Sequence, residues 1–184
     1  IVGLTGQSGA GKTTVSDTFR EHGFGIINCD LVARNVTEDG SECNKKLAKF
    51  FPECFDKDYK LDRARLGGIV FADKDKLKLL DDTIYPFINH NIECEINALS
   101  EQYEYILLDA PTLFEAGADK LCDVIVSVIA DEKLRLERIL LRDKIDEQKI
   151  KDRFSSQLSA DFFVSHSDYV IENNGDISFL PEQT

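Results

Sequence analysis

Five short apolar runs recur along the chain and predict five buried β-strands. Each run contains about four to six residues and is continuous, without the alternation of apolar and polar residues that marks a half-exposed strand. Continuous runs of this length are typical of parallel strands that are covered on both faces. The runs occupy residues 1–5, 25–29, 105–108, 124–129 and 169–171.

Segments with the helical spacing of apolar residues separate these runs. The first extends from Lys12 to His22 and is expected to end at Gly23, because glycine commonly terminates helices. Strands that alternate with helices indicate an α/β fold in which right-handed crossovers connect parallel strands. We therefore predict a three-layer α/β/α architecture around a mostly parallel five-stranded sheet.

The section from about residue 36 to residue 100 interrupts this alternation. It contains Pro52 and Pro86, and its apolar residues recur at helical spacing, as at Leu66 and Val70. We expect a mostly helical region that packs against one edge of the sheet. Such a region is either a substrate-binding lobe or a set of helices that cover the core, and the pattern favours neither.

The chain's length and charge narrow the possible partners. Its 184 residues are typical of one domain with an insertion rather than of two full domains. The formal net charge of −12 argues against binding to nucleic acid or to an anionic membrane, since both need a positive surface. A phosphate ligand would therefore have to be held by a local arrangement of donors.

Cysteine and histidine usage argues against a disulfide-stabilised protein and against a zinc protein. Five cysteines, an odd number without a CxxC pair, accompany three histidines, so a disulfide framework and a zinc site are both weakly supported. No apolar stretch approaches the roughly 18 residues that a membrane span needs. These features favour a cytoplasmic protein with reduced thiols.

The strongest chemical signal is a full match to GxxxxGK(S/T) between a predicted strand and a predicted helix. The match is Gly6-Gln7-Ser8-Gly9-Ala10-Gly11-Lys12-Thr13. Glycines allow such a loop to turn its N–H groups inward, and the helix that follows adds its positive end. Lys12 would reach the outer phosphates and the Thr13 hydroxyl would ligate Mg²⁺. The motif predicts a nucleotide-phosphate site.

Two acidic residues follow predicted strands and are candidates for chemistry. Asp30 comes directly after the run that ends at Cys29, so we expect it to open onto the same crevice as the P-loop. Its carboxylate would accept a proton from an attacking hydroxyl, or it would cap the helix that begins at Leu31. Asp109 closes the run 105–108 and would either hold Mg²⁺ or begin a turn.

The predicted helix 132–143 carries three arginines on one face. Arg135, Arg138 and Arg142 have the spacing i, i+3, i+7. Arginines clustered in this way suit the charge that develops on a transferring phosphoryl group. The alternative is a solvated face on which acidic residues of the same helix are the partners.

A P-loop is shared by kinases, GTPase switches and ATP-driven motors. The NKxD pattern that reads guanine in GTPases is not matched at residues 44–47, and the DxxG pattern fails at residues 109–112. The chain is also short for most motor domains. A small-molecule kinase is therefore the favoured class, with a regulatory nucleotide-binding module as the alternative.

Beyond the P-loop, a series of segments resembles the dephospho-CoA kinase family, whose members catalyse the last step of coenzyme A synthesis. Residues 29–34 are similar to the family's D-A-D-x-x-A-R, and residues 109–115 to its D-x-P-L-L-F-E. The other matching segments are residues 1–6, 61–71, 84–88, 138–143, 153–157 and 168–175. They occur in order over nearly the whole chain, and their combination is much more specific than the P-loop.

The resemblance implies a fold of the P-loop NTP hydrolase type with a helical insertion and a lid. It implies transfer of the γ-phosphoryl of ATP to the ribose 3′-hydroxyl of dephospho-CoA, with Mg²⁺. Asp30 would act as the base or orient the hydroxyl. Arg142 would lie in a mobile lid over the phosphates, with Arg138 as a helper, and the segment after Asn173 would lie near the adenine.

Each group of expected site residues follows from the motif or from the resemblance. The catalytic residues would be Lys12, Asp30 and Arg142. The ATP-binding residues would be Gly9, Ala10, Gly11, Lys12, Thr13, Thr14, Arg138 and Asn174. The metal ligands would be Thr13 and Asp109, and the acceptor would bind at Asp30, Arg34, Tyr85 and Phe114.

The expected organisation is a single kinase domain with three parts. The core would comprise about residues 1–35, 101–135 and 160–184, the acceptor-binding helices about residues 36–100 and the lid about residues 136–158. Its substrates would be ATP and dephospho-CoA, without nucleic acid, membrane or an obligatory protein partner. The alternatives are another P-loop kinase that acts on a nucleoside, a nucleotide or a small metabolite and, less favoured, a regulatory nucleotide-binding module.

Three residues depart from the family's pattern. Tyr85 stands where the family usually has His, Cys29 replaces a common Ala, and Thr112 replaces a Leu. The first departure affects any acceptor contact that the His normally makes, although a Tyr hydroxyl also donates a hydrogen bond. None of the three alters the phosphate chemistry.

Overall fold

The computed structural model describes residues 1–143 and 146–175. Within it the chain forms two compact units, one made of Ile1–Ile27 and the chain from Ala98 onward, the other of Asn28–Asn97. None of the described helices is long and apolar enough to cross a membrane. The division separates a unit that contains the sheet from a unit that is helical.

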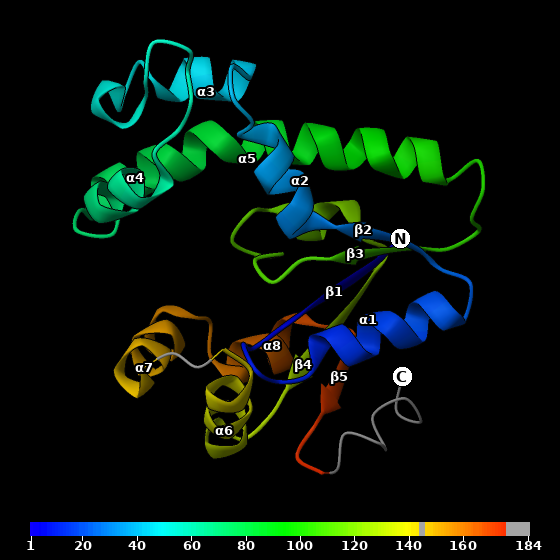
Figure 1. The fold of residues 1–184 in the computed structure, drawn as a ribbon. Helices are drawn as coiled ribbons and strands as arrows, with labels where there is room; N and C mark the ends of the chain where they lie inside the picture. Colours follow the sequence, from blue (N-terminus) through cyan, green and yellow to red (C-terminus); the bar gives the residue numbers. More distant parts are fainter. Residues whose placement is uncertain (144–145, 176–184) are drawn as a thin grey trace. The chain divides into compact units, whose positions relative to one another are not determined.

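The first unit is built on a five-stranded parallel sheet (Figure 1). Its strands are β1 (Val2–Gly6), β2 (Gly25–Asn28), β3 (Ile106–Asp109), β4 (Val124–Ile129) and β5 (Tyr169–Glu172). They lie in the order β2-β3-β1-β4-β5, and helices cover both sides of the sheet. The predicted α/β fold and all five predicted strands are confirmed.

The register of the central strands brings their carboxyl ends to one edge of the sheet. Leu4 of β1 is opposite Asp109 of β3 and also opposite Val126 of β4. These strands are buried on both faces, as their continuous apolar runs predict. The core cluster around them consists of Leu4, Ala10, Val15, Leu107, Val126, Val128, Ala130 and Ile171.

The described part of the first unit also contains helices that follow its strands and loops. Lys12–Glu21 forms α1, Glu132–Asp143 forms α6, Glu147–Ser156 forms α7 and Ala160–His166 forms α8. A short 3₁₀ helix spans Ala118–Leu121. Asp146 caps α7 and Ser159 caps α8, each through a side-chain oxygen that accepts a first-turn N–H. Helix α6 has the bounds that its arginine-bearing pattern predicts.

The second unit is helical, as the interrupted pattern predicts. Its helices are α2 (Cys29–Val36), α3 (Glu42–Leu47), α4 (Arg63–Val70) and the long α5 (Lys74–Leu99), which extends past the unit's last residue, with a 3₁₀ turn at Pro52–Cys54. Buried Asn44 organises the loops around α3. Its Nδ2 donates to the carbonyl oxygens of Thr37, Glu38 and Tyr59 at 3.3, 2.9 and 2.9 Å.

Candidate active site

The loop between β1 and α1 requires glycine at three positions. Gly6, Gly9 and Gly11 have φ values of 138°, 80° and 104°, a region that other residues rarely adopt. A Cβ on Gly6 would collide with the carbonyl oxygen of Val128, and one on Gly9 would lie 2.8 Å from that of Arg135. The glycines of the motif therefore permit the turn and also let the loop pack closely against the backbone at Val128 and Arg135.

The loop presents a set of N–H groups at the start of α1. Its first turns use some of them: the Gln7 amide donates to the carbonyl of Val128 at 3.1 Å and the Ala10 amide donates to that of Gln7 at 3.1 Å. Within the described part of the chain, no acceptor pairs with the amides of Gly9, Gly11, Lys12 and Thr13. Several such donors at the N-terminus of a helix form an anion site.

The side chains of Lys12 and Asp109 form an ion pair. Only 17% of the Lys12 side chain and 12% of the Asp109 side chain are exposed, so the pair is screened less than a surface pair. Sheet register explains the contact, because Asp109 ends the strand beside β1 and Lys12 follows the loop that leaves β1. Thr13, the other expected metal ligand, is exposed next to Lys12.

Arg138 contacts the backbone around the P-loop. Its Nη1 donates to the carbonyls of Asn173 at 3.1 Å and Gly9 at 3.5 Å, and its Nη2 donates to that of Gly175 at 3.4 Å. Asn174, expected near the adenine, accepts a hydrogen bond from the Asp131 amide at 2.7 Å. Both residues thus have partners just beyond the carboxyl ends of β4 and β5, and Arg138 also contacts the P-loop.

The three arginines of α6 have separate partners and form no common cluster. Arg135 is only 5% exposed; its Nε donates to the Ala130 carbonyl at 3.1 Å and its guanidinium lies 4.1 Å from the Phe154 ring centroid. Arg142 is exposed and pairs with Asp143 at 2.6 Å. That hydrogen bond raises the pKa of Arg142 and lowers the pKa of Asp143. Arg135 is therefore packed within the protein rather than on a solvated face of α6.

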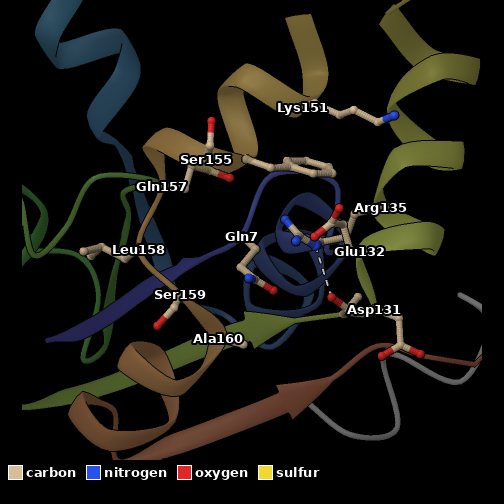
Figure 2. Close-up of a pocket in the computed structure, with 12 residues that line it drawn as sticks. Gln7, Asp131, Glu132, Arg135, Lys151, Ser155, Gln157, Leu158, Ser159 and Ala160 are labelled. Carbon is tan, nitrogen blue, oxygen red and sulfur yellow. Dashed lines mark hydrogen bonds between the residues drawn. The ribbon is translucent and has the colours of Figure 1, made fainter. Parts of the chain in front are cut away.

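The end of α7 is tied to the P-loop through Gln157 and Ser8. The Gln157 Oε1 accepts from the Ser8 amide at 3.2 Å, and its Nε2 donates to the Ser8 Oγ at 3.0 Å. A pocket of about 540 Å³ lies beside this contact, within the usual size range of small-molecule sites. Figure 2 shows Gln7, Arg135 and Glu132 among its lining residues.

Among the expected acceptor residues, Phe114 belongs to the first unit. Its half-buried ring lies 5.2 Å from that of Phe162, edge to face, and Phe162 stacks on His166 at 3.9 Å. Burial raises the pKa of the neighbouring Glu115 carboxyl. Phe114 thus lies in an aromatic cluster with residues of α8.

The other expected acceptor residues, Asp30, Arg34 and Tyr85, belong to the second unit. Asp30 is exposed in the first turn of α2, but it does not cap the helix. Asn28 is the cap, since its Oδ1 accepts from the Leu31 amide at 2.9 Å. The alternative interpretation of Asp30 as the N-cap is therefore wrong, because the preceding Asn already satisfies that amide.

Asn173 contacts the P-loop, although the sequence pattern assigns it no role. Its side chain is almost completely buried and donates to the Ala10 carbonyl of the P-loop at 2.7 Å. One signal in the sequence could have identified it. Asn173 is a polar residue directly after a predicted buried strand, and ligands bind at this edge of parallel sheets.

The described residues contain no group of three or more His, Cys, Asp or Glu side chains arranged to hold a metal ion. This finding excludes only a cage of three or more His, Cys, Asp or Glu side chains in residues 1–143 and 146–175. It leaves the sparser arrangement in which one or two protein oxygens share a Mg²⁺ ion with nucleotide phosphates.

Comparison with known proteins agrees with this geometry. The family model for dephospho-CoA kinase matches residues 1–178. The dephospho-CoA kinase of Fusobacterium nucleatum is 37% identical over 185 aligned residues, covering 98% of this chain and 92% of the relative. That of Saccharomyces cerevisiae is 35% identical, covering 100% of this chain and 79% of the relative.

A solved structure shares the fold over the same length. The dephospho-CoA kinase from Campylobacter jejuni has a TM-score of 0.72 and 26% identity, covering 99% of this chain and 92% of that one. The sequence matches extend over the P-loop, the helical unit and the α6–α8 region together, so they concern more than a shared nucleotide site. The chain belongs to the dephospho-CoA kinase family.

Proposed function

We propose that the chain transfers the γ-phosphoryl of ATP to the ribose 3′-hydroxyl of dephospho-CoA by in-line displacement, the activity for which its family is named. The observation that carries the proposal is the glycine-rich loop, whose N–H groups lie next to Lys12 at the start of α1. Such a loop neutralises and orients a chain of phosphates, and orientation supplies much of the catalysis of phosphoryl transfer.

Four amides of the loop are the proposed phosphate donors, those of Gly9, Gly11, Lys12 and Thr13. Their lack of an acceptor within the described residues supports this choice. The amides of Ala10 and Thr14 already donate to the carbonyls of Gln7 and Gly11. We therefore do not assign a phosphate contact to the amide of Ala10 or of Thr14. Thr14 would contact a phosphate through its hydroxyl instead.

Asp30 is the proposed group that accepts the proton of the attacking 3′-hydroxyl. Its carboxylate is exposed, and the residue that caps α2 is Asn28 rather than Asp30. The acceptor would be bound by Arg34, Tyr85 and Phe114 and by the helical region of residues 36–100. Tyr85 would use its hydroxyl where the family usually has a His imidazole.

Arg142 and Arg138 are the proposed cations for the transferred phosphoryl group. Arg142 lies at the exposed end of α6, in the expected lid of residues 136–158. Its partner Asp143 also lies 3.8 Å from Arg153, so a phosphate that takes the place of Asp143 on Arg142 would leave that carboxylate with a second cation. Arg138 and Asn174 would then border the nucleotide from the side of β5.

Mg²⁺ is a proposed cofactor, and the residues present fit it. The Asp109 carboxylate and the Thr13 hydroxyl are hard oxygen donors next to the P-loop, and Mg²⁺ needs only one or two of these in addition to phosphate oxygens. The contact with Lys12 uses Oδ1 of Asp109. When bound, the ion would neutralise part of the charge on the phosphates.

The proposed setting is the cytoplasm, with ATP and dephospho-CoA as the substrates. All five cysteines lie in the described part of the chain and none forms a disulfide, as in proteins of reducing compartments. The net charge of −12 supports a function that does not involve binding to nucleic acid or to an anionic membrane.

The proposal is tested by an assay that couples ADP release to added acceptors. Dephospho-CoA, adenosine, AMP and shikimate are compared at equal concentration with MgATP. ADP release is expected to depend on dephospho-CoA and to form CoA in equal amount. Faster turnover with another acceptor would favour a different small-metabolite kinase, and slow release without any acceptor would favour a regulatory module.

A further inference from the structure

We propose that Asn173 is a positioning residue that orients one peptide of the P-loop for phosphate binding. The residue lies directly after β5 and is only 2% exposed. Its Nδ2 donates to the carbonyl oxygen of Ala10 at 2.7 Å. The inference rests on the proposed function, because it concerns how the phosphate site is held in shape.

The backbone and side chain of Asn173 are both held in place by neighbouring groups. Its amide donates to the Ile129 carbonyl at 2.9 Å, which extends the pairing of β5 with β4. Arg138 donates to its carbonyl at 3.1 Å and to its Oδ1 at 3.5 Å. Because the guanidinium can only donate, the Oδ1 must face Arg138, and the Nδ2 must face Ala10.

The hydrogen bond to Ala10 determines where the next N–H group points. In a trans peptide the C=O and the following N–H point in opposite directions. A carbonyl of Ala10 directed at Asn173 therefore directs the Gly11 N–H away from Asn173. That N–H has no acceptor among the described residues and belongs to the residue that caps α1.

This peptide needs an external restraint because Gly11 imposes none. Rotation of the Ala10–Gly11 peptide changes the ψ of Ala10 and the φ of Gly11. Glycine tolerates φ values of either sign at similar energy, so the peptide could turn over at low cost. Asn173 adds a hydrogen bond that exists in only one of the two orientations, the one that presents the Gly11 N–H as a phosphate donor.

A purely structural role for Asn173 makes a different prediction. In that case its loss would lower the stability of the sheet but leave the nucleotide affinity of the folded protein unchanged. Asn44 is a matched control, since it is also buried and its Nδ2 also donates to backbone carbonyls, but in the second unit. The readout is the Kd for ADP, measured by calorimetry well below the unfolding temperature.

Asn173→Ala is expected to weaken ADP binding by about tenfold or more, the effect of losing a buried hydrogen bond that orients a donor. It should also lower kcat while leaving the KM for dephospho-CoA unchanged. Asn44→Ala should lower the Tm but keep the Kd for ADP within about twofold of wild type. A folded Asn173→Ala protein with the wild-type Kd would overturn the proposal.

Asn173→Asp keeps the size of the side chain and provides a second test. Its ionised carboxylate cannot donate to Ala10, whereas its protonated form regains an O–H donor. Relative to Asn173→Ala, its ADP affinity should therefore rise as the pH falls, and a ratio independent of pH would contradict the positioning role. If the wild-type protein binds ADP but does not phosphorylate dephospho-CoA, the proposed function is wrong, and the positioning role of Asn173 is still tested by ADP binding.

Discussion

At the scale of single residues, the lysine proposed to bind phosphate is already paired within the protein. Lys12 contacts Asp109 through an ammonium–carboxylate pair that is mostly shielded from water. A phosphate must therefore compete with a carboxylate for the same cation. The same carboxylate is the proposed Mg²⁺ ligand, so one residue influences both nucleotide affinity and catalysis.

Asp109→Asn separates these two effects. Removal of the carboxylate charge releases Lys12, so ADP without metal should bind several-fold more tightly, about 1 kcal/mol. Turnover with MgATP should fall by about tenfold or more, because the proposed metal ligand is weakened. Calorimetry with ADP and EDTA, together with steady-state kinetics, measures both. Exposed Asp161→Asn is the control, and unchanged kinetics in Asp109→Asn would contradict the metal assignment.

Residue roles also show the limits of sequence patterns. Arg135 and Arg138 share a helix face by spacing, but Arg135 is buried against Phe154 and Arg138 donates to loop carbonyls. Asp30 is a common capping type, but Asn28 caps α2. In both cases several residues of suitable type are close in sequence, and only packing determines which of them takes each partner.

At the scale of elements, the strand–loop–helix unit of β1 and α1 combines positive φ angles with tight packing. Gly6 illustrates both, because its φ is 138° and its missing Cβ leaves room for the backbone of β4. Gly117 offers a comparison, because its φ is 66° but a Cβ added to it would meet no neighbouring atom within 4 Å. At Gly6 both the φ angle and the lack of space for a Cβ require glycine, whereas at Gly117 only the φ angle favours it.

Gly6→Ala should therefore destabilise the protein much more than Gly117→Ala. We expect about 1 kcal/mol for Gly117→Ala, the cost of the left-handed conformation. Gly6→Ala adds the collision with the Val128 carbonyl, so a loss of about 2–4 kcal/mol is expected. Urea unfolding of the two variants tests the difference. Equal losses in the free energy of unfolding would show that β4 can move away from the added methyl group without destabilising the protein.

Element boundaries were the most predictable level of the structure. The strands begin and end within one or two residues of the apolar runs, and α6 spans Glu132–Asp143 as its pattern indicates. Continuous burial on both faces leaves few alternative interpretations for such runs. The long α5 was less evident, because Pro86 lies inside it and proline usually marks an end.

At the scale of the whole molecule, the proposed catalytic groups are divided between two compact units. Lys12 and the P-loop belong to the sheet-bearing unit, and Asp30 belongs to the helical unit of Asn28–Asn97. Nucleotide binding and acceptor activation should therefore be separable by mutation. The acceptor-binding role of the helical unit remains a prediction.

Asp30→Asn should bind ATP normally but lose transfer to dephospho-CoA by about a hundredfold or more, the usual contribution of a general base. Lys12→Ala should lose both ATP affinity and turnover while staying folded. Glu101→Gln, an exposed change outside the residues assigned to either substrate, should retain activity. Equilibrium binding of ATP and single-turnover transfer provide the two measurements. Normal transfer by Asp30→Asn would remove its catalytic role.

The sequence by itself determined the strand and helix pattern, the phosphate loop and the family, because these depend on local periodicity and on residues that are consecutive in the chain. Only the tertiary structure decided that Lys12 pairs with Asp109, that Gln157 contacts Ser8 and that Asn173 holds Ala10. These partners are about a hundred or more positions apart in the chain. Contacts of that kind depend on strand order and register, which no local pattern specifies.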